Sequence, residues 1–378
     1  MTRFAIANGR IVTSQGLLEA ATLSVRDATI AAIGAPGDGG DALDLEGGWL
    51  MPGFIDTQVN GGGGVLFNDD ISVGGIAAIG AAHAAFGTTG FLPTLISDDM
   101  DRIAAALDAA DAAIAAGVPG VLGVHIEGPF LNVARKGIHD AAKLRRLDEQ
   151  ALALLTRPRA GKVMLTLAPE LCDPADIRRL ADAGVIVSAG HSNADHATVV
   201  RALAAGLRGF THLFNAMSPL LHRAPGVVGA ALDDPDSWCG LIVDGVHVDP
   251  VALRIALRAK NPAKFMLVTD AMPNIGTTAD SFMLQGKSIN VAGGTLQDDD
   301  GTLAGADLDM AAAVRNAVRL IGVAPETASM MAAGAPAAFL SLSDRHGTLA
   351  PGQRADWVWL DADLHPRGTW IGGQRVDG

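Results

Sequence analysis

The feature that most constrains this chain is a set of short apolar segments, each ending in a residue that can bind a metal or move a proton. The four end residues are Glu127, His191, His212 and Asp270. The chain between them reads as alternating strands and helices. In a barrel of parallel strands all carboxyl ends meet at one face, where active sites form. The pattern therefore predicts that these four side chains converge at one site.

The middle of the chain contains eight apolar strand candidates, separated mostly by alanine-rich helical patterns. The candidates are 50–59, 89–95, 121–127, 163–168, 185–189, 208–212, 239–243 and 265–270. The helical patterns include 100–116, 175–183, 194–205 and 250–259. Near-continuous apolar strands alternating with helices indicate a parallel sheet covered on both faces. The predicted class is α/β, as a TIM-like (β/α)8 barrel rather than an open doubly wound sheet.

Both ends of the chain are β-rich. Strand-like runs occupy 4–12, 21–25 and 29–33 at the start, and 356–361 and 368–371 at the end. They predict a small β-sandwich domain built from residues 1–50 and 345–378, with the barrel spanning 51–344. Within the barrel, residues 281–343 predict a β excursion and two helices that pack back onto it.

Composition excludes several classes of function. The 378 residues carry a formal net charge of -13, whereas nucleic-acid binding needs a basic face, so we expect no nucleic-acid partner. The first residues lack the apolar core of a signal peptide, which makes the cytoplasm the expected location. Residues 71–97 carry no charge, but glycines and Pro93 interrupt them. They predict a buried helix and a buried strand rather than a membrane span.

Three of the strand-end residues form a known type of metal-ligand set. Strand alternation places His125 and Glu127 on one side, the barrel interior, where a carboxylate is costly unless it is paired or bound to a cation. A salt bridge to lysine or arginine is the alternative for Glu127, and each histidine taken singly is more often a core residue. Together, Glu127, His191 and His212 match a catalytic zinc set that leaves one position open for water.

Three further residues are candidates for catalysis or binding. Asp270 ends the last strand, where it could cap a helix or take a proton from a metal-activated water. His247 follows the seventh strand and could hold substrate. His139 lies in the loop after Glu127, either exposed or folded over the pocket.

Several motifs resemble the amidohydrolase superfamily, and within it the deacetylases of N-acetylated amino sugar phosphates. They are PGFID at 52–56 followed by Gln58 and Asn60, HIEGPF at 125–130, GHS at 190–192, THLFNAM at 211–217, DGVH at 244–247, VTDA at 268–271, GTLAG at 301–305 and GQRAD at 352–356. The resemblance covers nearly the whole chain, and HIEGPF with THLFNAM is its most specific part.

The resemblance implies hydrolysis of N-acetylglucosamine 6-phosphate to glucosamine 6-phosphate and acetate. A metal held by Glu127, His191 and His212 would activate the attacking water. Asp270 would be the general base and then the general acid. His139 would hydrogen-bond the carbonyl oxygen as charge develops on it.

The resemblance also implies the substrate-binding residues and the assembly. His247 would bind the sugar, and Asn215 with the backbone of Ala216 would hold the phosphate. Arg223 would add positive charge by reaching the site of a neighbouring subunit, which implies a homodimer. A surface position without function is the alternative for Arg223.

Gln58 and Asn60 occupy the position where many amidohydrolases carry the His-x-His pair of a two-metal site. Neutral amides are poor zinc ligands beside imidazole, so we expect one divalent metal per subunit, with the two amides among the substrate-binding residues. Zn2+ is the expected ion, and Fe2+ and Co2+ also accept two imidazoles and a carboxylate.

Other functions remain open at this point. A deacetylase for the galactosamine epimer or an N-acyl-amino-acid hydrolase would keep the metal set, and the second would not need Arg223. A non-catalytic barrel that acts as a scaffold would have lost its general base, yet Asp270 is present.

Overall fold

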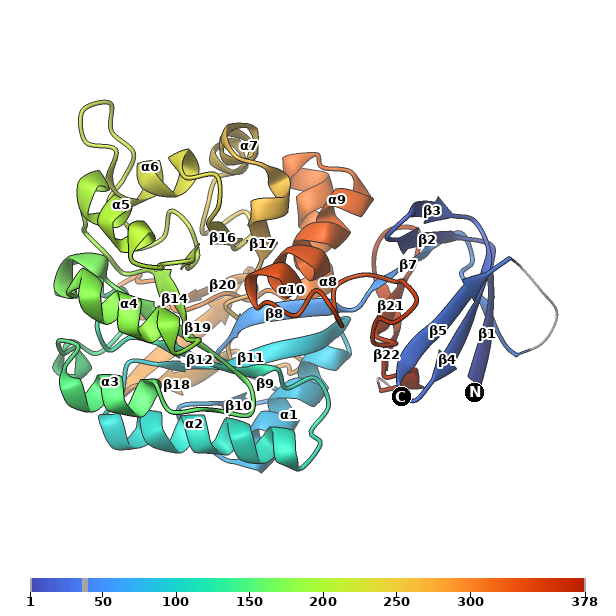
Figure 1. The fold of residues 1–378 in the computed structure, drawn as a ribbon, viewed down its shortest axis with the longest axis horizontal. Coiled ribbons are helices and arrows are strands. Elements are labelled where there is room, and N and C mark those ends of the chain that lie inside the picture. The colour runs from blue at the N-terminus through green and yellow to red at the C-terminus, as the bar shows by residue number, and fades with distance from the viewer. Residues whose placement is uncertain (1, 36–39, 377–378) are drawn as a thin grey trace.

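The computed structural model describes residues 2–35 and 40–376, and its centre is a barrel of eight parallel strands (Figure 1). The strands are β8 (Phe54–Val59), β11 (Thr88–Ile96), β12 (Gly123–Glu127), β13 (Lys162–Leu167), β14 (Ile186–Ala189), β15 (Gly209–Phe210), β16 (Trp238–Leu241) and β17 (Phe265–Leu267). They lie in this order around the sheet, and a parallel bridge from Val59 to Ala271 joins its two edges. The predicted (β/α)8 architecture is confirmed.

Helices cover the outside of the barrel. They are α1 (Val73–Ala84), α2 (Met100–Ala115), α3 (Glu149–Leu155), α4 (Pro174–Asp182), α5 (His196–Ala204), α6 (Gly226–Asp233), α7 (Pro250–Ala259), α8 (Met310–Asn316), α9 (Pro325–Ser329) and α10 (Ala335–Phe339). Several begin behind an aspartate, such as Asp148 or Asp195, whose carboxylate accepts an N–H of the first turn. The uncharged stretch 71–97 contains the whole of α1 and β11, as predicted. In the described part of the chain, no helix has both the length and the apolarity to cross a membrane.

The two ends of the chain form a separate pair of β-sheets beside the barrel, and both termini lie there (Figure 1). One sheet has the order β5-β4-β1-β6 and the other β23-β22-β21-β7-β2-β3. Their bounds are β1 (Thr2–Ala7), β2 (Arg10–Thr13), β3 (Gly16–Leu18), β4 (Ala21–Arg26), β5 (Thr29–Gly34), β6 (Asp41–Asp44), β7 (Trp49–Pro52), β21 (Trp357–Leu360), β22 (Pro366–Ile371) and β23 (Gln374–Arg375). Phe4, Leu23 and Trp357 are buried between them, which supports the predicted β-sandwich.

Two expected strands are broken by turns. The candidate 50–59 divides at Gly53: β7 pairs with β2 and β21 in the small sheet, and only β8 enters the barrel. A side chain at Gly53 would meet Thr89 Oγ1 at 2.1 Å, so the chain can pass this close only as glycine. The candidate 4–12 divides in the same way between β1 and β2, at Asn8, which has a positive φ of 56°.

The β excursion is an antiparallel sheet of β18 (Ser281–Leu284), β19 (Lys287–Ala292) and β20 (Thr295–Gln297). Its apolar residues pack against Ile96 and Met272, beside the carboxyl ends of the barrel strands. The loop after β12 approaches the same face through two short 3-10 helices, η1 (Val133–Arg135) and η2 (Ala141–Lys143). A further hairpin, β9 (Gly61–Gly62) with β10 (Val65–Leu66), follows β8.

Candidate metal and catalytic site

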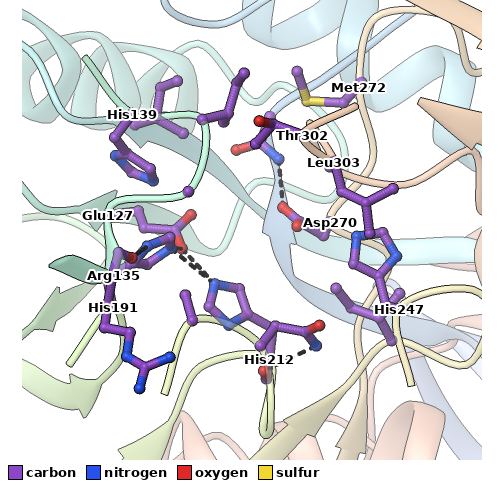
Figure 2. A pocket seen from close by; sticks show the side chains of 18 of the residues that line it. Glu127, Arg135, His139, His191, His212, His247, Asp270, Met272, Thr302 and Leu303 are labelled. Atoms are coloured by element: carbon purple, nitrogen blue, oxygen red, sulfur yellow. Dashed lines mark hydrogen bonds and ion pairs between the residues drawn. The ribbon is translucent and has the colours of Figure 1, made fainter. Parts of the chain in front are cut away.

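A cavity of about 390 Å³ opens at the carboxyl ends of the barrel strands (Figure 2). Most of the predicted site residues line it, namely Asn60, Glu127, His139, His191, His212, Asn215, Ala216, His247 and Asp270. The structure therefore brings together the four strand-end residues from which the site was predicted.

Glu127, His191 and His212 form a compact triangle of ligand atoms. The Nε2 atoms of His191 and His212 lie 3.2 and 3.0 Å from Oε1 of Glu127, and 3.1 Å from each other. Ligand atoms about 2.0 Å from a tetrahedral zinc ion would be about 3.3 Å apart. The triangle thus has nearly the dimensions of three zinc ligands.

The hydrogen bonds of His191 show why a cation fits here. Its Nδ1 lies 2.8 Å from the carbonyl oxygen of Arg135, which can only accept, so Nδ1 carries the proton. The other ring nitrogen, Nε2, lies 3.2 Å from Oε1 of Glu127, so either a proton or a cation must lie between them. Among the described residues, no lysine or arginine pairs with Glu127, which excludes the salt-bridge alternative. The donor set therefore suits a divalent metal.

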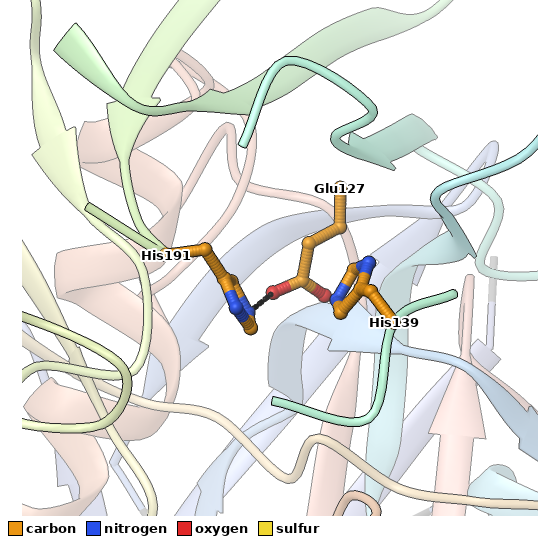
Figure 3. Close-up of side chains that lie close together, drawn as sticks. All are labelled: Glu127, His139 and His191. Atoms are coloured by element: carbon orange, nitrogen blue, oxygen red, sulfur yellow. Dashed lines mark hydrogen bonds and ion pairs between the residues drawn. The ribbon is translucent and has the colours of Figure 1, made fainter. Parts of the chain in front are cut away.

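His139 also lies close to Glu127 and His191, with ligand atoms within 4.8 Å of one another (Figure 3). Its Nδ1, however, accepts the backbone N–H of Ser97 at 3.3 Å, which leaves the proton on Nε2. A protonated nitrogen cannot bind a metal, so His212 is the better third ligand and His139 is better suited to donate a hydrogen bond. His139 is only 2% exposed, so the exposed-loop alternative was wrong.

Three of the four strand-end residues have a left-handed backbone. The φ angles are 49° for His191, 36° for His212 and 52° for Asp270, and none of these residues is glycine. Such a conformation costs about 1–2 kcal/mol and is concentrated at functional sites. Because β15 ends at Phe210 and β17 at Leu267, His212 and Asp270 lie just beyond their strands, not within them as predicted.

Burial and charge set the pKa values of the acidic groups. Burial alone would raise the pKa of Glu127, but hydrogen bonds with His191 and His212 hold it well below its ordinary value. For Asp270, burial and then the negative charge of Glu127 raise the pKa to about 6. The two carboxyl groups therefore differ: Glu127 stays ionised, whereas Asp270 can gain and lose a proton near neutral pH.

Burial and charge also shift the pKa values of two histidines in this cavity. Burial opposes the charged form of His212, but Glu127 outweighs it and raises the pKa of His212. Burial, followed by the charge of His191, lowers the pKa of His139 to about 3, so this ring is neutral at pH 7. His125 lies deeper, between the hydroxyls of Thr94 and Thr166, and serves as a buried core residue.

The residues on the other side of the cavity are polar. His247 is held by Asp244, whose Oδ2 lies 2.6 Å from Nδ1 of the ring, which leaves Nε2 free for a ligand. Asn215 lines the cavity beside the left-handed Ala216 (φ 51°). The N–H of Ala216 forms no hydrogen bond with any residue that the structure describes.

Two predicted site residues do not line the cavity. Arg223 lies exposed on a loop before α6. Gln58 is 1% exposed and lies behind the site, where its side-chain amide donates hydrogen bonds to Glu127 and Asp270. Sequence reasoning also missed the apolar wall of the cavity, whose residues Ile96, Met272, Leu284 and Leu303 lie on β11 and in or around the β excursion. Nothing in their local pattern distinguishes them from core residues.

Comparison with known proteins gives a consistent result. The model of the amidohydrolase family matches residues 49–376. An N-acetylgalactosamine-6-phosphate deacetylase of Shewanella sp. (strain ANA-3) is 44% identical, over 98% of this chain and 95% of its own. An N-acetylglucosamine-6-phosphate deacetylase of Bos taurus is 39% identical, over 88% and 84%.

A solved structure extends this similarity to three dimensions. The crystal structure of N-acetylglucosamine-6-phosphate deacetylase from Pasteurella multocida superposes with a TM-score of 0.94 at 34% identity, covering 99% of both chains. The family model, the relatives and the fold agree with the metal-ligand geometry at the barrel mouth, and on these grounds the chain belongs to the amidohydrolase family.

Proposed function

We propose that the chain is a metal-dependent deacetylase of N-acetylhexosamine 6-phosphates, with N-acetylglucosamine 6-phosphate as its first substrate. The observation that carries the proposal is the convergence of Glu127, His191 and His212 beside Asp270 in one cavity. The similarity to deacetylases over almost the whole chain supports it.

Glu127, His191 and His212 would hold one divalent metal, for which we propose Zn2+. When bound, the metal would supply Lewis acidity that polarises the amide carbonyl and lowers the pKa of a water toward about 7. The amides of Gln58 and Asn60 offer no imidazole for a second metal, which supports a single ion per subunit.

Asp270 moves the protons. In its ionised form it accepts a proton from the attacking water as the oxygen bonds to the carbonyl carbon. It then delivers that proton to the amide nitrogen, the C–N bond breaks, and acetate and the free amine leave. A pKa near neutrality suits both steps because the group must take up a proton and release it.

His139 stabilises the charge on the carbonyl oxygen. Its Nδ1 is engaged by Ser97, so Nε2–H is the donor that remains for the substrate. A neutral donor in a buried site stabilises developing negative charge without titrating during the reaction.

The polar side of the cavity would bind the sugar phosphate. His247 would accept a hydrogen bond from a sugar hydroxyl, and the free N–H of Ala216 with the amide of Asn215 would bind the phosphate. Arg223 lies outside its own cavity, so its proposed phosphate contact requires a homodimer in which it reaches the partner's site. We propose the cytoplasm as the location, since Cys172 and Cys239 are unpaired.

N-acetylgalactosamine 6-phosphate is a second candidate substrate. It is favoured by the 44% identity to a deacetylase named for that epimer, higher than the 39% to the Bos taurus glucosamine enzyme. The two sugars differ at one hydroxyl, and both would use the same metal set and the same proton transfers.

The test is acetate release from both phosphorylated epimers, from unphosphorylated N-acetylglucosamine and from an N-acetyl amino acid, with the metal content of the protein measured alongside. We expect turnover of a phosphorylated sugar only, and the faster epimer identifies the substrate. Faster turnover of the bare sugar or the amino acid would contradict the phosphate site. No turnover with the metal bound would favour the scaffold alternative.

A further inference from the structure

The amide side chains of Gln58 and Asn60 join the two carboxylates of the site. Nε2 of Gln58 lies 3.2 Å from Oε2 of Glu127 and 3.0 Å from Oδ1 of Asp270. Nδ2 of Asn60 lies 2.7 Å from the same Oδ1. A carboxylate oxygen only accepts hydrogen bonds, so both amide nitrogens must donate to it.

This arrangement makes the two oxygens of Asp270 unequal. Oδ1 receives two N–H donors, whereas Oδ2 bonds to none of the residues that the structure describes. A hydrogen bond to the charged form disfavours protonation at that oxygen. The proton would therefore be accepted at Oδ2.

The backbone holds the same residues in register where the barrel closes. The N–H of Asp270 donates to the carbonyl of Gln58 at 3.0 Å, and the N–H of Asn60 donates to the carbonyl of Ala271 at 2.9 Å. Asp56 adds a further connection, because Thr269 Oγ1 donates to its Oδ2 at 2.5 Å. The left-handed Asp270 is thus fixed against the end of β8 on both backbone and side chain.

We propose that Gln58 and Asn60 are positioning residues that orient Asp270, with Oδ1 held and Oδ2 presented to the substrate. Gln58 has a second role, because its other N–H orients the metal ligand Glu127. This inference rests on the proposed function, and it replaces the expectation that the two amides bind substrate.

Positioning of Asp270 and direct binding of substrate predict different kinetics for a mutant of Asn60. If Asn60 positions Asp270, Asn60→Ala lowers kcat about 10- to 100-fold, as expected for loss of a hydrogen bond to a charged group, and leaves substrate affinity unchanged. If Asn60 binds substrate, affinity falls instead. Affinity is measured by calorimetry in the Asp270→Asn background, with and without Asn60→Ala, so that no turnover interferes.

A double-mutant cycle tests whether the effect passes through Asp270. In the Asp270→Asn background, Asn60→Ala should cost no further activity, because the group that it positions is already lost. An equal loss in both backgrounds would overturn the proposal, as would a rise in the substrate dissociation constant with kcat unchanged. Asn290→Ala, on the exposed face of β19, is the matched control and should change neither quantity.

Measurements of metal affinity distinguish the roles of the two amides without any activity measurement. Of the two amides, only that of Gln58 contacts Glu127, so Gln58→Ala should weaken Zn2+ binding about 10-fold in competition with a chelator, while Asn60→Ala leaves it unchanged. The assignment would be contradicted if both mutations weakened Zn2+ binding equally, or if neither weakened it. Asn60→Ser replaces Asn60→Ala if the latter lowers the melting temperature.

Failure of this inference differs from failure of the proposed function. If the wild-type protein releases no acetate from either phosphorylated sugar, the proposed function fails. If it does, and Asn60→Ala retains full kcat, only the positioning role fails.

Discussion

The barrel has a hollow at each end, and the volume of a hollow does not predict which one contains the candidate site. The cavity at the carboxyl ends of the strands has about 390 Å³. A groove of about 840 Å³ lies at the other end, lined by the segments that precede β15, β16 and β17. The larger hollow is not the one that contains the candidate catalytic residues.

The polar groups explain the difference. In the groove, Arg208 donates to the carbonyl of Ala338 and Lys264 to that of Asp236, and both cations lie over the ring of Trp238. At the cavity, ring nitrogens and a carboxylate face one another with lone pairs that only a cation or a proton can satisfy. Unsatisfied ligands and left-handed strand ends mark the functional end.

The largest expected effect comes from removing a proposed metal ligand at the cavity. His212→Ala should release the metal and lower acetate formation about 10⁴-fold or more, because several kcal/mol of charge stabilisation are lost with it. His196→Ala, at the groove, is the matched control. Metal content and initial rates check both; a His212→Ala protein that keeps its metal would contradict the ligand set.

Removing the proposed base should lower the rate while the metal stays bound. Asp270→Asn should reduce kcat about 10²- to 10⁴-fold, the usual range for general acid–base catalysis. Asp236→Asn changes the same group at the groove and should have no effect on kcat. A mutant at Asp270 with normal acetate release would exclude it as the base.

The value of kcat/KM should fall on the acid side of neutrality. Asp270 accepts a proton in its ionised form, so kcat/KM falls as the pH decreases. Burial and Glu127 raise the pKa of Asp270 to about 6, and a bound cation favours ionisation, so the acid limb should lie at or below that value. An acid limb that persists unchanged in Asp270→Asn would belong to another group.

The smallest expected effect concerns the left-handed backbone at the cavity. Ala216→Gly should stabilise the protein by about 1 kcal/mol, because Ala216 has a φ of 51°. Ala230→Gly, within α6 at the groove, should destabilise it by about 1 kcal/mol. Thermal unfolding of both variants checks this, and shifts of the same sign would contradict it.

The sequence was sufficient to predict the barrel and the convergence of the proposed metal ligands because both follow from local patterns. Apolar runs that end in Glu127, His191 and His212 place these side chains at one face, whatever the details of packing. The amide that donates to Glu127 could not be predicted in the same way, since it depends on a contact across the barrel.

Gln58 illustrates what could not be predicted. It bonds to Asp270, 212 residues later in the chain, and this pairing exists only because the barrel closes between β8 and the segment after β17. The left-handed backbone of His212 and Asp270 was equally hidden, because His and Asp adopt it more often than most residues but still only in a small minority of positions. Which positions adopt it depends on the tertiary structure.

Metal reconstitution tests the proposed single-metal site most directly. Protein stripped with a chelator is supplied stepwise with Zn2+, and acetate release from N-acetylglucosamine 6-phosphate and its galactose epimer is followed. With one metal site per chain, we expect no release without metal and a linear rise that stops at one equivalent. Activity that survives stripping, or that needs a second equivalent, would contradict it.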